Sequence, residues 1–294
     1  HRDLHSFPTR RSSDLKNIDC SLNSALWFKL TKDKELTYKI LWEDFYTPKS
    51  IYISKSESYD VKNIWVWYPL VVKPSDTDHW DWVTVNIKDE NELQKAIDFA
   101  FTFSKKIIVQ NFALWFDHRL LVVWDKVSAV AMRKPPYIIW NWLDTIKELI
   151  ESENKNPLRW DGDHSKPLTS IKIDDELTTC LSLQNYSLDS ILENKKEIFL
   201  RRNANLSTWG FSVDLTDDIH EDNKKIAIET AKKLELKVAW VDIVCMDISK
   251  PLKETCWIII EVNNTPWLRM HHFPTIWIPR NPALDILKLK FWLK

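Results

Sequence analysis

The stretch Trp257–Trp267 carries the side chains whose types and spacing say most about chemistry. Three isoleucines run directly into Glu261, Val262 and Asn263. Because strand side chains alternate between faces, Glu261 and Asn263 share one face. A carboxylate and an amide oxygen two residues apart at the end of a buried strand suit Mg²⁺, which binds hard oxygen ligands. The pattern predicts a cation site, and a solvated strand face is the alternative.

A second strand-like run lies about twenty residues earlier. Residues 238–244 are mostly apolar and include Asp242. If this run and the one ending at Asn263 pair as a hairpin about Pro251, Asp242 falls opposite Glu261. Three oxygen ligands would then surround one point.

Lys73 and the loop after it are candidates for binding phosphate. Lys73 ends an apolar run and can point a compact charge at a phosphate, although a surface lysine is the alternative. His79, Trp80, Asp81 and Trp82 follow. With glycine at 80 and 82, backbone N–H groups could approach a triphosphate closely. With indoles there, they could not.

Two arginine-containing segments are further anion-binding candidates. Arg119 follows Asp117 and His118, and its guanidinium can hold a carboxylate or phosphate in bidentate fashion. A structural ion pair with Asp117 is the alternative. The run 201–210 combines two arginines, two amides and two hydroxyls with little apolar content, which favours an anion-binding surface over core.

The composition limits the class of partner. The chain has 294 residues with 41 basic and 42 acidic side chains, and its net charge is −1. This balance indicates neither a nucleic-acid nor a membrane partner, and no apolar run approaches the length of a membrane span. The four cysteines form no C-x-x-C pair, which fits a reducing, cytoplasmic location.

Glycine is almost absent. The chain has two glycines, against a usual share of about 7%, and 17 tryptophans. Several tryptophans stand where glycine is expected, such as Trp124 between two strand-like runs. We hypothesise that most or all are UGA codons translated as tryptophan, from an organism that reads UGA as glycine. A Trp-rich protein is the alternative, and a majority of UGG among the 17 codons would favour it.

The rest of the chain indicates alternating strands and helices. Residues 1–15 look like foreign sequence, with a native disordered tail as the alternative. Asp33 and Asp89 are expected to cap helices, strands are expected near 50–53, 68–72 and 107–110, and 151–197 is polar and mixed. The alternation favours an α/β or α+β fold with mixed sheets.

Together these motifs resemble the ATP-grasp domain of cyanophycin synthetase. The similarity runs from about residue 22 to 290 and rests on seven segments: Asp33-Lys34, the run from Tyr68 to Pro74, the His79 loop, Asp117 to Arg119, Arg202 to Gly210, the run containing Asp242, and the run from Glu261 to His271. Many tryptophans fall where that family carries glycine. Glutathione-synthesis ligases have a related domain and are the nearest alternative.

The resemblance implies an α+β fold of two lobes with mixed or antiparallel sheets that grip ATP between them. Residues 16–110 would form the smaller lobe, and 111–294 would form the lobe with the metal site. The activity implied is ADP-forming ligation of a carboxylate to an amine through an acyl phosphate. In cyanophycin synthetase the domain extends a poly-aspartate backbone.

The resemblance also implies residue roles. Lys34 and Lys73 would contact phosphates, and Gln110, Asn111 and Ala113 would face adenine. Gln110 stands where the family usually has glutamate, and its side-chain amide can still hydrogen-bond to the base. The ligands of one or two Mg²⁺ ions, with Mn²⁺ as a substitute, would be Asp242, Glu261 and Asn263. Arg119, Arg202 and Asn205 would hold the acyl phosphate or the substrate carboxylate, and His79 would position the amine.

The expected partners are an amino acid and a peptide-chain substrate, and a homo-oligomer is compatible with the sequence. Full cyanophycin synthetases continue into a second ligase domain, and no G-x-x-x-x-G-K-[ST] motif occurs here. We therefore expect a fragment of a longer gene or a stand-alone ATP-grasp protein. A nucleotide-binding module without ligase activity is the alternative from another class. With tryptophan at 80, 82, 209 and 267, we expect no tight ATP binding.

Overall fold

The chain divides into two compact units. The computed structural model describes residues 22–75, 82–113, 115–139, 141–160, 168–191, 197–201, 210–265, 267–276 and 278–291. The smaller unit takes in 131–215 and 267–281, and the larger one takes in 17–130, 216–266 and 282–294, each over its described residues. The predicted division at residue 110 does not coincide with these limits and stays a prediction.

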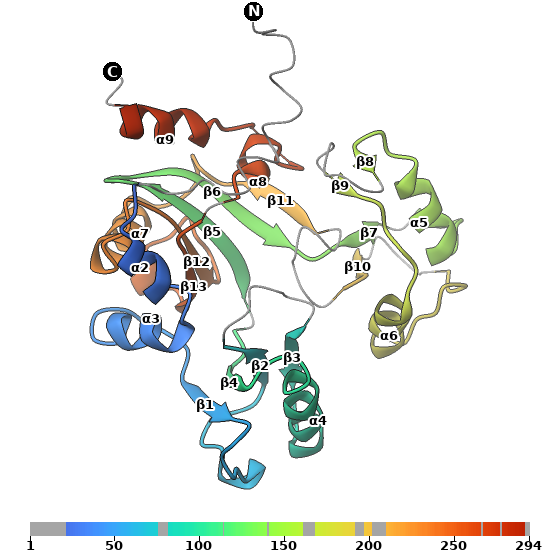
Figure 1. Cartoon of the computed structure of the whole chain (residues 1–294). Coiled ribbons are helices and arrows are strands. Elements are labelled where there is room, and N and C mark those ends of the chain that lie inside the picture. Colours follow the sequence, from blue (N-terminus) through green and yellow to red (C-terminus); the bar gives the residue numbers. More distant parts are fainter. Residues whose placement is uncertain are drawn as a thin grey trace, which may run out of the picture. The chain divides into compact units, whose positions relative to one another are not determined.

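A four-stranded antiparallel sheet forms one part of the larger unit (Figure 1). Its order is β1-β4-β2-β3, with α4 packed against it. The bounds are Ser50–Ser54 for β1, Leu70–Pro74 for β2, Thr84–Ile87 for β3, Lys106–Asn111 for β4 and Glu90–Ala100 for α4. The predicted cap is confirmed, since the Asp89 side chain accepts a hydrogen bond from the backbone N–H of Glu92.

The two faces of this sheet differ in character. One face packs against α4 and forms a buried cluster, which includes Leu70, Val72, Val109, Leu93 and Ile97. Burying each such side chain stabilises the fold by roughly 1.5–3 kcal/mol. Because strand side chains alternate, the opposite face carries the intervening residues of β2 and β4, which include Lys73 and Gln110. The core therefore fixes which face presents the polar groups.

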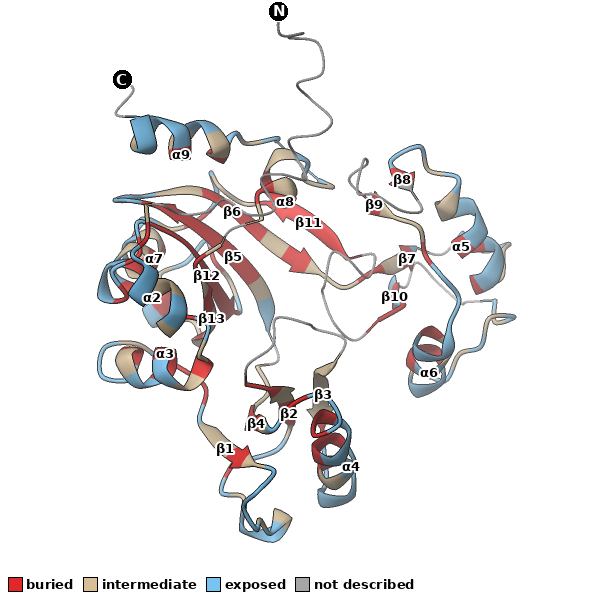
Figure 2. Ribbon diagram, viewed as in Figure 1, coloured by how far each residue is buried: buried red, intermediate tan, exposed pale blue. Residues whose placement is uncertain are grey.

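A second antiparallel sheet runs through the larger unit in the order β6-β5-β12-β13. The bounds are Phe116–Val123 for β5, Lys126–Lys134 for β6, Val238–Cys245 for β12 and Trp257–Asn263 for β13. Figure 2 shows β12 as buried, and every residue of that strand is buried. The end of β6 continues into the smaller unit and pairs there with β11.

Three further helices of the larger unit begin at side-chain caps, which are Ser24, Asp33 and His220. The bounds are Ala25–Leu30 for α2, Lys34–Leu41 for α3, Glu221–Lys233 for α7 and Pro282–Phe291 for α9, with 3₁₀ turns at Val61–Asn63 and Leu252–Glu254. The predicted cap of α3 is confirmed, because Asp33 accepts from two backbone N–H groups. Among the described residues, no helix is long and apolar enough to cross a membrane.

The smaller unit has short strands and its own core. The bounds are Tyr137–Ile139 for β7, Arg159–Trp160 for β8, Leu168–Thr169 for β9, Glu197–Phe199 for β10, Phe211–Asp214 for β11, Ile146–Asn154 for α5, Asp175–Leu183 for α6 and Arg269–His272 for α8. Helix α6 lies within the stretch expected to be polar and mixed. Its three buried residues, Leu177, Cys180 and Leu181, are too few to show a clear period in the sequence.

Two tryptophans adopt a backbone conformation that favours glycine. Trp124, at the turn between β5 and β6, has φ of 60°, and Trp142 has φ of 76°. A residue with a Cβ pays about 1–2 kcal/mol in this left-handed region, and glycine does not. Both tryptophans are exposed to solvent, Trp142 to 59% and Trp124 to 50%. These positions support the glycine hypothesis, which stays a proposal.

Replacing Trp124 or Trp142 by glycine is expected to raise the free energy of unfolding by about 1 kcal/mol each, because the left-handed strain is relieved. Denaturant unfolding measures the change. Trp65→Gly is the matched control, since Trp65 is 90% exposed and does not have a positive φ. An increase for the control as large as for the two turn variants would contradict the explanation.

Candidate active site

The predicted pairing of Asp242 with Glu261 is confirmed. In the register of β12 and β13 the two residues are partners, with an irregularity directly after Asp242. On its other side Asp242 pairs with Arg119 of β5. Antiparallel partners have their side chains on one face. The three strands therefore bring two carboxylates and a guanidinium together on one face of the sheet.

Arg119 holds Asp242 through both carboxylate oxygens. Its Nε donates to Oδ1 at 2.7 Å, and its Nη2 donates to Oδ2. Asp242 is thus the bidentate partner of this guanidinium. Asp242 is 0% exposed, so the pair balances a charge that would otherwise be buried alone.

Helix α3 brings Lys34 to Glu261. The Lys34 Nζ lies 3.4 Å from Oε1 of Glu261, and the Asn263 side chain hydrogen-bonds to the same carboxylate. Burial opposes ionisation of Glu261, but Lys34, Lys73 and Arg119 together lower its pKa below the usual value. Glu261 is therefore a carboxylate, the form that binds a metal ion.

Tyr38 connects the two sheets of the larger unit. Its hydroxyl donates to the backbone carbonyl of Ile260 on β13, and the Lys73 Nζ lies 3.4 Å from the hydroxyl oxygen. Desolvation by burial, together with the nearby Lys34 charge, lowers the pKa of Lys73 to about 8. Lys73 thus lies near Glu261 of β13. The nearby carboxylates Glu261 and Asp242 do not fully offset the cost of burying its charge.

The cluster of Lys34, Lys73, Arg119, Asp242 and Glu261 has one more basic than acidic group. A polyanion would balance this excess, and a lysine with a lowered pKa gains most from such a ligand. The donors Asp242, Glu261 and Asn263 fit a hard divalent cation by their chemistry. Within the described part of the chain, no group of three or more His, Cys, Asp or Glu side chains is placed to hold a metal; the predicted set has two carboxylates and one amide.

The three residues predicted to face adenine lie at the end of β4. Gln110 is buried and pairs with Val71 on the sheet face that also carries Lys73. The Asn111 side chain donates to the carbonyl of Trp67 at 2.7 Å, and Ala113 is half-buried just beyond the strand. Gln110 and Lys73 thus share one sheet face, whereas the side-chain amide of Asn111 is engaged by the chain itself.

Three predicted site residues, His79, Arg202 and Asn205, lie outside the described residues. The sequence motifs did not predict two residues, Tyr38 and Asn264, that the structure places at the site. Tyr38 stands four residues after Lys34 in α3, a spacing that puts both side chains on one helix face, so its signal was available. Asn264 donates to the carbonyl of Phe28 at 2.7 Å and anchors the end of β13.

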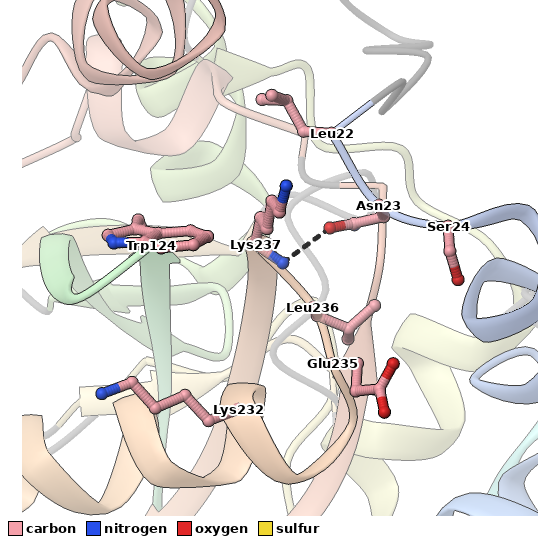
Figure 3. A pocket seen from close by; sticks show the side chains of 8 residues that line it. All are labelled: Leu22, Asn23, Ser24, Trp124, Lys232, Glu235, Leu236 and Lys237. Atoms are coloured by element: carbon pink, nitrogen blue, oxygen red, sulfur yellow. Dashed lines mark hydrogen bonds between the residues drawn. The ribbon is translucent and has the colours of Figure 1, made fainter.

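A pocket of about 460 Å³ lies elsewhere in the larger unit (Figure 3). It is lined by Leu22, Asn23, Ser24, Trp124, Lys232, Glu235, Leu236 and Lys237. The pocket lies where β12 begins, and none of its lining residues belongs to the predicted site. The indole of Trp124 forms one wall, so glycine at that turn would remove the wall.

His118 predicts acid sensitivity of the fold. It is buried on β5 with its Nδ1 3.5 Å from the Cys245 sulfur, and desolvation lowers its pKa from 6.5 to about 4. A depressed folded-state pKa means that stability is present above pH 6.5 and is lost as the pH falls towards 4. We expect a loss of about 3 kcal/mol over this range, measured by urea unfolding. His118→Leu should remove most of the loss in unfolding free energy that His118 causes between pH 6.5 and 4. If the unfolding free energy of the variant falls as steeply with pH as that of the parent chain, His118 is not the cause.

Comparison with curated proteins finds similarity to two kinds of ligase. The chain is 42% identical to cyanophycin synthetase of Synechocystis sp. over 226 residues, which are 76% of this chain and 26% of that protein. It is 36% identical to a glutathione biosynthesis bifunctional protein of Listeria monocytogenes over 208 residues, 70% of this chain and 26% of that protein. The chain thus spans about a quarter of the length of these relatives. No family model matches it.

Solved structures give the same result for the fold. A bifunctional glutathione synthetase from Pasteurella multocida aligns with a TM-score of 0.66 at 27% identity, covering 92% of this chain and 38% of that one. D-alanine–D-alanine ligase from Bacillus anthracis aligns with a TM-score of 0.51 at 15% identity, covering 84% and 61%, and bears on the fold alone. The chain therefore has the ATP-grasp fold, and most of it matches a part of the cyanophycin synthetases, as the sequence motifs predicted.

Proposed function

We propose that the chain is the ATP-grasp part of an ADP-forming carboxylate–amine ligase. The observation that carries the proposal is the cluster of Lys34, Lys73 and Arg119 around Asp242 and Glu261. It combines an excess of basic groups, which suits a triphosphate, with oxygen donors that suit Mg²⁺. The similarity to two ligases supports the same class.

The reaction has two steps. The terminal phosphoryl group of ATP passes to a substrate carboxylate, which gives an acyl phosphate and ADP. An amine then attacks the acyl carbon, the amide bond forms, and phosphate leaves. In this chain Lys34 and Lys73 hold the phosphates, and Gln110 faces the base, with Asn111 and Ala113 beside it. Arg119 neutralises the charge that develops on the transferred group.

Asp242, Glu261 and Asn263 would hold one or two Mg²⁺ ions, which screen the phosphate charge; Mn²⁺ would substitute. Arg202, Asn205 and His79 complete the proposal, the first two at the acyl phosphate and His79 at the amine. We propose an amino acid and a growing poly-aspartate or cyanophycin chain as substrates, since cyanophycin synthetases are the more similar relatives. We further propose that the protein forms a homo-oligomer in the cytoplasm and binds neither nucleic acid nor membranes.

The test is phosphate release by the chain with glycine at its tryptophan positions, incubated with ATP, Mg²⁺, aspartate and a cyanophycin primer. We expect release that depends on both primer and amino acid. The chain as it stands is assayed in parallel. Release with glutathione precursors instead would favour the alternative, a glutathione-synthesis ligase, which the similarity to the Listeria protein supports.

A second candidate function is a nucleotide-binding module without ligase activity. Arg119 favours it in one respect, because its guanidinium is engaged by Asp242 and so is not directed at a ligand. ATP binding without phosphate release for any amino acid would support this candidate. Primer-dependent release would exclude it.

A further inference from the structure

Trp240 lies beside the proposed metal site, in the middle of β12. Its register partners are Leu121 on β5 and Asn263 on β13, and its side chain is 4% exposed. Because residues two apart in a strand share a face, Trp240 lies on the same face as Asp242. The indole is therefore a buried neighbour of two proposed metal-binding side chains.

The Arg119 guanidinium lies between the indole and Asp242. Its central carbon is 4.1 Å from the centre of the Trp240 ring, a distance at which a cation is attracted to the ring face. Its nitrogens hold both carboxylate oxygens of Asp242. A planar guanidinium satisfies the two contacts at once, since stacking uses its face and hydrogen bonding uses its edge.

This arrangement opposes binding of a divalent cation. A cation at Asp242 would share the carboxylate with a positive group already within hydrogen-bonding distance, and two like charges repel strongly where water is excluded. Cation binding is therefore easier when Arg119 moves away from Asp242, which relieves this repulsion. The indole restrains that movement, because it packs on the guanidinium and the side chain has little solvent to enter.

We infer that Trp240 is a positioning residue that keeps Arg119 on Asp242 and thereby weakens divalent-cation binding. The inference rests on the proposed metal site at Asp242 and Glu261. It differs from the expectation that tryptophans elsewhere crowd the nucleotide, because it acts through the arginine and requires no nucleotide. A residue without a ring face at 240 releases the guanidinium, and Asp242 becomes available.

The test is Mn²⁺ binding to the intact chain without nucleotide, measured by the loss of the free Mn²⁺ signal in electron paramagnetic resonance. We expect Trp240→Leu and Trp240→Gly to bind Mn²⁺ at least about tenfold more tightly than the parent chain. Leucine keeps the strand apolar and is the safer variant for folding. Trp240→Phe retains a ring face and should stay within about twofold of the parent.

Ile243→Ala is the matched control, because it opens a cavity in the same strand without touching Arg119; it should also bind as the parent does. If Glu261→Gln abolishes Mn²⁺ binding, the metal site stands. If Trp240→Leu and Trp240→Gly then both bind Mn²⁺ with the affinity of the parent chain, the inference is overturned. Equal tightening by Trp240→Phe or Ile243→Ala would overturn it as well, since general loosening would then suffice. If no variant binds Mn²⁺ in a Glu261-dependent manner, both the metal site and the inference fail.

Discussion

Replacing Asp242 by asparagine is expected to lower the free energy of unfolding by about 4 kcal/mol. The carboxylate is fully buried and accepts two hydrogen bonds from Arg119. Its removal leaves the buried guanidinium without the carboxylate that holds it, and the Glu261 charge is then shared among Arg119, Lys34 and Lys73. This costs more than the ion pair itself contributes. Urea unfolding of the two chains at pH 7 measures the difference.

The double variant Arg119→Leu with Asp242→Leu distinguishes loss of the ion pair from general disruption of packing at these positions. Because it removes both charges and fills the space with apolar groups, we expect it to unfold within about 1 kcal/mol of the parent chain. Asp125→Asn, an exposed aspartate at the β5–β6 turn, is the matched control and should have no effect. A loss for the double variant as large as that for Asp242→Asn would show that the ion pair is not the cause.

Local patterns in the sequence were sufficient to predict the strands that carry the site. Alternation placed Glu261 and Asn263 on one face, and the short connection between the two runs left a hairpin as the simplest pairing, which put Asp242 opposite Glu261. The caps at Asp33 and Asp89 were likewise readable, because a cap depends only on neighbouring residues. These predictions are confirmed because each rests on contacts close in the chain.

The partner of Arg119 could not be predicted in the same way. Arg119 and Asp242 are 123 residues apart and meet because β12 pairs with β5, a strand that is not its neighbour in sequence. Asp117, two residues away, was the only acidic partner that local reasoning offered. The hydrogen bond from Tyr38 to the Ile260 carbonyl of β13 was not predicted for the same reason, because these residues are also far apart in the sequence. The roles of His79, Arg202 and Asn205 stay predictions, because those residues lie outside the described part of the chain.

Replacing Lys73 by methionine is expected to stabilise the free chain while abolishing tight ATP binding. Burial lowers the pKa of Lys73 to about 8, against 10.5 for a free lysine. Below pH 8 the lysine is charged in both states, so the folded state bears the full cost of burying the charge. This cost disappears as the pH rises from 8 to 10.5. Methionine should therefore raise the free energy of unfolding by about 2 kcal/mol at pH 7, less than the full shift implies because Lys73 keeps some solvent contact.

Binding should change in the opposite direction, because a triphosphate supplies the negative charge that Lys73 lacks. In chains with glycine at 80, 82, 209 and 267, Lys73→Met should weaken ATP binding by about 100-fold, as calorimetry would measure. Lys105→Met, at an exposed lysine next to β4, is the matched control and should change neither quantity. A loss of both stability and ATP affinity in Lys73→Met would mean that Lys73 supports the fold. A gain in stability with unchanged affinity would place the phosphates elsewhere, since a buried cation that binds no anion costs stability without serving the ligand.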